Sequence, residues 1–149
     1  MDNHSQLMTT FPLFKGFTEN GTKRLLDAGE VMHHAPAEVL LTEGDTAEFV
    51  LLVLTGKLDV FVQRQGKDLL LTEAGPGAIL GELAVLCGIP RSASVRSKEA
   101  SSTLKWSDEA FRSLLLRDHS LSQRVFSRAL RTLVDKERSL IDSLTAAQG

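Results

Sequence analysis

Cysteine is almost absent from this chain, since Cys87 is the only one among 149 residues. A single thiol excludes an internal disulfide and a zinc site built from several cysteines. Proteins without disulfides are typical of reducing compartments, so we expect this one in the cytoplasm. Because Cys87 has no CxxC partner, we expect its side chain to be a small buried hydrophobic group.

The chain also lacks an excess of charge of either sign. Lysine and arginine total 17 against 19 aspartate and glutamate residues, which gives a formal net charge of -2. This balance provides no broad positive field to attract DNA. We therefore expect no nucleic-acid binding by this chain alone, and any anion site must be local.

Long apolar runs are missing as well. No stretch approaches the roughly 20 apolar residues that a membrane span requires, and residues 1–10 lack the basic and apolar regions of a signal peptide. We therefore expect no membrane span. A length of 149 residues is typical of one domain, so we expect residues 1–149 to form a single domain.

Motifs for catalysis and metal binding are absent too. The sequence has no Walker loop, nucleophile elbow or HExxH pair. His33 and His34 are adjacent and would point to opposite faces of a strand, while His4 and His119 lie far away in the sequence. We expect no enzyme activity, no catalytic residue, no metal ion and no cofactor.

Three patterns follow one another along the chain. In residues 1–30, apolar residues surround a proline and a glycine, and Thr18 is placed to cap a helix that runs toward Ala28. Residues 31–106 contain short β-rich runs whose turns recur at intervals of about 8 to 12 residues, which is typical of a β-sandwich or barrel. The predicted strands are residues 38–42, 49–54, 57–63, 69–73 and 92–95, with a hairpin tip at residues 65–67.

Residues 107–145 return to helical spacing. Ser107 is placed to cap a helix that has Asp108 and Glu109 in its first turn, and a second amphipathic run extends from Leu121 to Leu144. The apolar stripe of this last helix favours packing against the core, while its length leaves room for self-association.

The stretch 77–95 carries the most informative chemistry. Its glycines precede a short helical turn that Gly88 and Pro90 must end. Unpaired amides at the start of a helix, here around Leu83 and Ala84, are suited to bind phosphate oxygens. We therefore expect a short helix between two strands that holds an anion.

Two opposite charges accompany this turn. Arg91 has a permanent charge and paired donors that match phosphate oxygens. Glu82 would repel a phosphate unless its carboxylate accepts a hydrogen bond from a ligand hydroxyl, such as a ribose 2′-OH. A ligand with both groups explains both charges, and an internal salt bridge between the two residues is the alternative.

The order Gly81-Glu82-Leu83-Ala84, six further residues and then Arg91-Ser92-Ala93 resembles the phosphate-binding cassette of cyclic-nucleotide-binding domains. The resemblance extends over nearly the whole chain. Residues 12–17 are similar to the family's N-terminal helical entry, and residues 43–45 and 54–56 are similar to its strand-turn glycines.

The resemblance implies an α+β fold. It consists of an antiparallel β-roll (a jelly-roll-like double-stranded β-helix) with an N-terminal helical unit, a short cassette helix and C-terminal helices. In this sequence the N-terminal helical segment would be residues 1–30 and the β-roll residues 31–106. The phosphate-binding cassette would be residues 81–93, and the lid helices residues 107–145.

The resemblance also implies roles for the cassette residues. Glu82 would bind the ribose 2′-OH, and Arg91 would bind the cyclic phosphate. The other ligand-binding residues that it implies are Gly81, Leu83, Ala84, Ser92 and Ala93. Serine at position 92 is similar to members that favour cAMP, so cAMP is the expected ligand and cGMP the alternative.

In the resembled family the last helix closes over the base, which implies a base contact near residues 135–138. Such helices often form dimer or relay surfaces, so the resemblance leaves a homodimer through the C-terminal helix open. The implied function is a regulatory sensor that converts ligand binding into movement of the C-terminal helix and so acts on an effector domain or partner protein.

Two other functions stay open. A β-roll that no longer responds to nucleotide would serve as an interaction or dimerisation domain. A fragment of a transcription factor similar to the catabolite activator protein is the other, but no helix-turn-helix pair follows Leu144.

Overall fold

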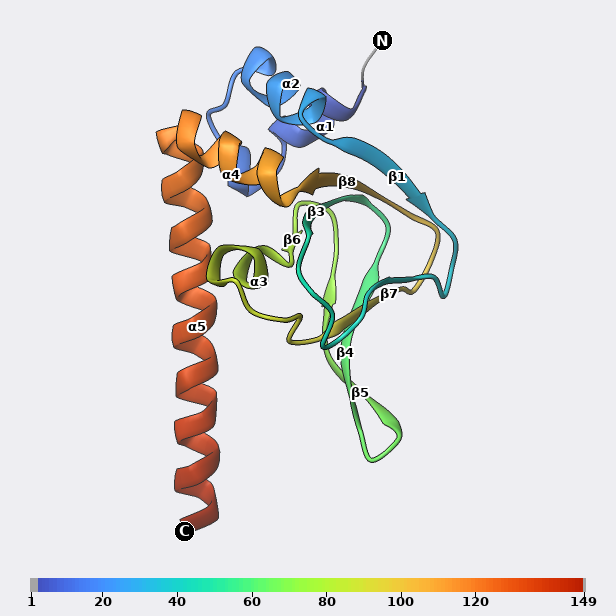
Figure 1. Ribbon diagram of the computed structural model, residues 1–149, viewed down its shortest axis with the longest axis vertical. Coiled ribbons are helices and arrows are strands. Elements are labelled where there is room, and N and C mark those ends of the chain that lie inside the picture. The colour runs from blue at the N-terminus through green and yellow to red at the C-terminus, as the bar shows by residue number, and fades with distance from the viewer. Residues whose placement is uncertain (1–2, 149) are drawn as a thin grey trace.

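The computed structural model describes residues 3–148, which form two antiparallel sheets with helices at both ends of the chain (Figure 1). The N-terminal helices are α1 (Asn3–Thr9), the 3-10 helix η1 (Pro12–Phe14) and α2 (Glu19–Asp27). The strands are β1 (Glu30–His34), β2 (Val39–Leu41), β3 (Phe49–Thr55), β4 (Leu58–Arg64), β5 (Lys67–Ala74), β6 (Ile79–Leu80), β7 (Ser94–Ser97) and β8 (Ser101–Ser107). The remaining helices are α3 (Glu82–Cys87), α4 (Asp108–Arg117) and α5 (His119–Gln148).

Each sheet has four strands. One has the order β1-β8-β3-β6 and the other the order β2-β7-β4-β5, and every neighbouring pair is antiparallel. The α+β β-roll that the resemblance implied is therefore confirmed. Of the described residues, no helix combines the length and the apolar character needed to cross a membrane.

Strand β3 joins the two halves of the core. Val50, Leu52 and Leu54 pack with the helices, whereas Leu51 and Val53 pack inside the roll. Successive side chains of a strand point to opposite faces, so a strand buried on both faces needs a continuous apolar run. The sequence FVLLVL in residues 49–54 meets this requirement.

The structure confirms the two helix caps and the hairpin tip that the sequence predicts. The Thr18 and Ser107 hydroxyl oxygens cap α2 and α4 by accepting hydrogen bonds from the amides of Gly21 and Ala110, at 3.0 and 3.1 Å. The hairpin between β4 and β5 turns on Gln65 and Gly66, both with positive φ. Two such residues are the signature of a tight hairpin turn that suits the twist of the strands.

Strands β1, β6 and β8 were not predicted. Strand β8 lies in the middle of its sheet although it begins with Ser101, Ser102 and Thr103, and all three side chains are buried. Their hydroxyls have partners inside the fold: the Ser102 hydroxyl meets that of Thr55 at 2.6 Å, and the Thr103 hydroxyl lies 2.8 Å from a ring nitrogen of His34. Tertiary partners thus permit a central strand that looks like a polar loop in the sequence.

Helix α5 runs along one side of the roll and continues past it, and the β4–β5 hairpin projects toward the same end of the molecule (Figure 1). Leu121, Val125 and Ala129 are buried against the rest of the chain. The apolar stripe of this helix therefore packs in the core only over its first part, and its later members are exposed. The exposed apolar residues of α5 are Phe126, Leu130, Leu133, Val134, Leu140, Ile141 and Leu144.

Candidate functional site

The short helix α3 stands between two glycines in the left-handed conformation. Gly81 has a φ of 83° and Gly88 a φ of 65°. A side chain at position 81 would be strained for a second reason, because its Cβ would lie 2.2 Å from Nη1 of Arg91. Glycine therefore lets the backbone and the arginine approach each other at the start of this helix.

The Arg91 guanidinium is buried, with 4% of the residue exposed. Its Nη1 donates to the Gly81 carbonyl at 3.0 Å and its Nη2 to the Phe49 carbonyl at 2.6 Å. The guanidinium carbon also lies 4.9 Å from the centroid of the Phe49 ring. Two of the five N–H donors are thus used in fixing the side chain, which leaves others to bind an anion.

Two carboxylates act on this cation. Burial lowers the pKa of Arg91, while the negative charges of Asp45 and Glu82 raise it. The guanidinium binds carbonyl oxygens rather than the Glu82 carboxylate, so the alternative of an internal salt bridge between the two residues is wrong.

Glu82 occupies the first position of α3 and is half-buried. Burial raises the pKa of its carboxyl, against the lowering effects of its own backbone amide and of the positive charges of Arg128, Lys136 and Arg91. The carboxylate therefore lacks the solvation that would fully stabilise its charge. A hydroxyl that donated a hydrogen bond to it would offset this loss.

A cavity of about 110 Å³ lies at the start of α3. Its lining includes all seven residues that the sequence singled out as ligand-binding: Gly81, Glu82, Leu83, Ala84, Arg91, Ser92 and Ala93. Strand residues Leu41, Val60, Leu80 and Val95 complete the wall. The fold thus brings two segments of the cassette together around one space.

A larger groove of about 1300 Å³ separates α5 from the roll and shares Val60 and Leu80 with the small cavity. On the side of α5 it is lined by residues between Ser122 and Arg131. Residues 135–138, where the resemblance implied a base contact, lie farther along α5 than this lining.

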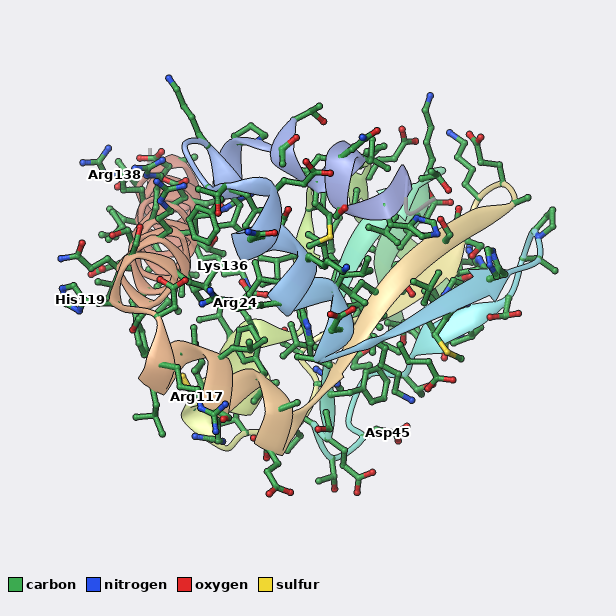
Figure 2. The ribbon with its side chains drawn as sticks, turned by 90° about the horizontal axis from the view of Figure 1, so that it is seen from above. Arg24, Asp45, Arg117, His119, Lys136 and Arg138 are labelled. Atoms are coloured by element: carbon green, nitrogen blue, oxygen red, sulfur yellow. The ribbon has the colours of Figure 1, made fainter. Side chains whose placement is uncertain are left out.

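Lys136 and Arg138 differ in their direction. In Figure 2, Lys136 lies on the side of α5 that faces the rest of the molecule, whereas Arg138 points away from it. The direction of Lys136 agrees with its electrostatic effect on Glu82. The positive charge of Lys136 thus helps to lower the pKa of Glu82.

Several neighbours of the cassette could not be predicted from the sequence. Phe49 and Asp45 contact Arg91 from 42 and 46 positions away in the chain, through the Phe49 carbonyl and through a backbone hydrogen bond of 2.8 Å from the Arg91 amide to the Asp45 carbonyl. No local motif links such distant residues. Cys87 was expected to be buried, but it is exposed at the end of α3.

Metal ligands do not gather in the described part of the chain, where no group of three or more histidine, cysteine, aspartate and glutamate side chains is arranged to hold an ion. The donors and acceptors of the cassette suit a different ligand, one that carries an anionic group and a hydroxyl.

Comparison with known proteins points to such a ligand. A family model described as a cyclic nucleotide-binding domain matches residues 31–118, more than half of the chain. The cAMP-dependent protein kinase regulatory subunit of Blastocladiella emersonii is 32% identical over 113 residues, which are 75% of this chain and 28% of that protein. The chain thus spans less than a third of the length of this relative.

Solved structures share the fold. The catabolite activator protein of Thermus thermophilus has a TM-score of 0.79 and 25% identity, and the match covers 87% of this chain and 61% of that one. The regulatory subunit of a cAMP-independent protein kinase A from Trypanosoma brucei has a TM-score of 0.71 and 25% identity over 85% of this chain and 44% of that one.

The close approach at Gly81 can be tested by Gly81→Ala. A left-handed conformation costs an alanine about 1 to 2 kcal/mol, and here the new Cβ would also displace the Arg91 guanidinium from its carbonyl partners. We expect the free energy of unfolding in urea to fall by more than this conformational cost. Gly66→Ala is the matched control, since Gly66 has a φ of 75° and open space around it; equal losses in the two variants would contradict the role of the arginine contact.

The buried carboxyl makes stability depend on pH. Because burial raises the pKa of Glu82 in the folded state, the folded protein keeps this proton to a higher pH than the unfolded chain does, and stability falls as the pH rises through that interval. Glu82→Gln should therefore be more stable than the wild type at neutral pH, and the difference should shrink in acid. Urea unfolding at a series of pH values measures it, with the exposed Glu99→Gln as control; a variant that is less stable at neutral pH would refute the prediction.

Proposed function

Because the chain belongs to the cyclic nucleotide-binding domain family, we propose that it is a non-enzymatic sensor domain that binds a cyclic nucleotide, with cAMP as its first ligand. The observation that carries the proposal is the single cavity in which the predicted ligand-binding residues meet. Hydrogen-bond donors that suit an anion lie there beside the partly desolvated Glu82 carboxylate. A cyclic phosphate joined to a ribose requires this arrangement, because the phosphate needs the donors and the ribose hydroxyl needs an acceptor.

The phosphate would lie at the start of α3. The backbone amides of Leu83 and Ala84 are among the first of this helix and have no partner within it. The Arg91 guanidinium is held against the Gly81 carbonyl, and Arg91 lines the same cavity as Leu83 and Ala84. A charge already fixed in position loses little entropy when it binds an anion, which favours affinity.

The ribose would lie against Glu82. A carboxylate that burial has partly desolvated needs a hydrogen-bond donor, and a 2′-OH supplies one beside the phosphate. This arrangement explains why an acidic residue stands next to an anion site.

The base would extend into the groove between the roll and α5. The cavity of about 110 Å³ is smaller than the roughly 300 Å³ at which pockets for small ligands begin, so a whole nucleotide exceeds it. The groove opens from it at Val60 and Leu80 and has room for a purine. Ser92 favours cAMP by the resemblance, and cGMP is the alternative.

Helix α5 would act as the lid. The positive charges of Arg128 and Lys136 on this helix interact with the Glu82 carboxylate and lower its pKa, so the charge of the cassette affects the energy of the helix position. A ligand shifts a conformational equilibrium only as far as it binds one arrangement better, and a tenfold preference corresponds to about 1.4 kcal/mol. Movement of α5 is the proposed output to an effector domain or partner protein, and a cytoplasmic location suits the free thiol of Cys87.

The exposed apolar stripe of α5 would be covered by a second copy of the chain. Leu130, Leu133, Leu140 and Leu144 follow one another at steps of three, seven and four residues and share one face of the helix. Exposed apolar faces of this kind mark interaction surfaces. We therefore propose a homodimer through α5.

A β-roll that does not respond to nucleotide is the second candidate. One of the structural neighbours, from Trypanosoma brucei, is described as part of a cAMP-independent kinase, so the fold alone does not guarantee a response to cAMP. In such a domain the stripe on α5 would carry the function. Nucleotide binding separates the two candidates.

Calorimetric titration of nucleotide-free protein with cAMP and cGMP tests the sensor. We expect Arg91→Ala and Glu82→Ala each to weaken binding by roughly 1.5 to 3 kcal/mol, the value of a hydrogen bond to a charged group. Arg96→Ala is the control, because Arg96 pairs with Asp68 at 3.0 Å and stacks on Phe61, outside the cavity lining.

The 2′-deoxy analogue of cAMP sharpens this test. It should bind the wild type more weakly than cAMP does, and Glu82→Ala should bind the two nucleotides equally, because the lost hydroxyl and the lost carboxylate belong to one hydrogen bond. Absence of saturable binding by the wild type would favour the second candidate.

Self-association can be tested by Leu133→Asp and Leu140→Asp. A charge in the middle of the stripe should shift the protein toward the monomer in sedimentation equilibrium, because burying it between two helices is costly. Leu116→Asp on α4 is the matched control, since Leu116 is 89% exposed and lies outside the stripe. A wild type that stays monomeric at high concentration would contradict the dimer.

A further inference from the structure

The C-terminal end of the cassette helix α3 is held by a side chain from another helix. The last carbonyls of a helix have no partner within it. In α3, the amides of Gly88 and Ile89 both donate to the Ala84 carbonyl, and Nη2 of Arg112 donates to the next carbonyl, that of Val85. Arg112 belongs to α4 and thus caps α3 from outside.

The Arg112 side chain has a second partner, on its own helix. Its Nε donates to Oδ1 of Asp108, one turn earlier on α4, while the far end of the guanidinium reaches α3. A cation at the C-terminal end of a helix also faces the negative end of the helix dipole. One planar group therefore bonds two helices at once.

Apolar contacts follow the same path. Val85 of α3 and Phe111 and Leu115 of α4 belong to one buried cluster. Helices α4 and α5 are separated by Asp118 alone, whose amide donates to the Leu114 carbonyl and whose Oδ1 accepts a hydrogen bond of 3.0 Å from the Leu121 amide. A displacement of α4 is thus passed to the start of α5.

From these contacts we infer that Arg112 is a positioning residue that couples the cassette helix to the two C-terminal helices. The inference rests on the proposed function, in which the ligand phosphate binds at the other end of α3. Helix α3 has six residues, so a phosphate at its first turn and a guanidinium at its last act on one rigid unit. A shift of α3 on binding would pull on α4 through Arg112 and move α5.

Distance measurements by electron spin resonance test the coupling. Two cysteines that carry spin labels, Glu99→Cys on the roll and Ser139→Cys on α5, are introduced into a Cys87→Ser background. The labelled protein is diluted with unlabelled protein, so that the measured distances are those within one chain. We expect cAMP to shift the distance in the wild-type background. In Arg112→Ala the change in distance on adding cAMP should fall to less than half of the wild-type change. Calorimetry on the same samples should give a dissociation constant for cAMP within about fivefold of the wild type, because Arg112 does not line the cavity.

Two variants control for loss of structure. Arg112→Lys keeps a cation at the end of α3 and should recover part of the shift. Arg117→Ala removes another exposed arginine of α4 and should behave as the wild type. Normal binding with a full shift in Arg112→Ala would overturn the coupling alone, whereas absence of binding by the wild type would overturn the proposed function as well.

Discussion

The Arg91 guanidinium is buried beside the backbone, and the rest of the site depends on how it is held there. A buried cation is tolerated only where polar groups surround it. Here the Gly81 and Phe49 carbonyls accept two of its hydrogen bonds, which ties the start of α3 to β3. The same closeness requires glycine at position 81. Loss of the arginine would therefore release the cassette from the sheet as well as remove a charge.

Strand β3 provides the firm base for this contact. Because it is buried on both faces, it links the packing inside the roll to the packing under the helices. The Phe49 carbonyl that holds Arg91 lies at the beginning of this strand. The cassette is therefore joined at its N-terminal end to a strand that is buried on both faces, and at its C-terminal end to α4 through Arg112. The two ends of one short helix connect to different parts of the molecule.

Features that depend on neighbouring residues could be predicted from the sequence, and features that depend on distant ones could not. The caps at Thr18 and Ser107, the hairpin tip and the glycines around α3 are local, and the structure agrees with each. Strand β8 was missed because its buried hydroxyls find partners only in the folded chain. The exposure of Cys87 and of the later part of α5 was missed for a related reason. An apolar pattern shows which residues share a face, but not what covers that face.

The proposed dimer interface and the proposed binding groove for the base share residues of helix α5. Phe126 and Leu130 belong to the exposed stripe and also line the groove where the base would lie. A second copy on the stripe and a ligand in the groove would then touch the same side chains, so each would change the free energy of binding the other. Such coupling is reciprocal by thermodynamic necessity. A lid helix that is also a dimer interface therefore cannot respond to nucleotide without also changing its affinity for its partner.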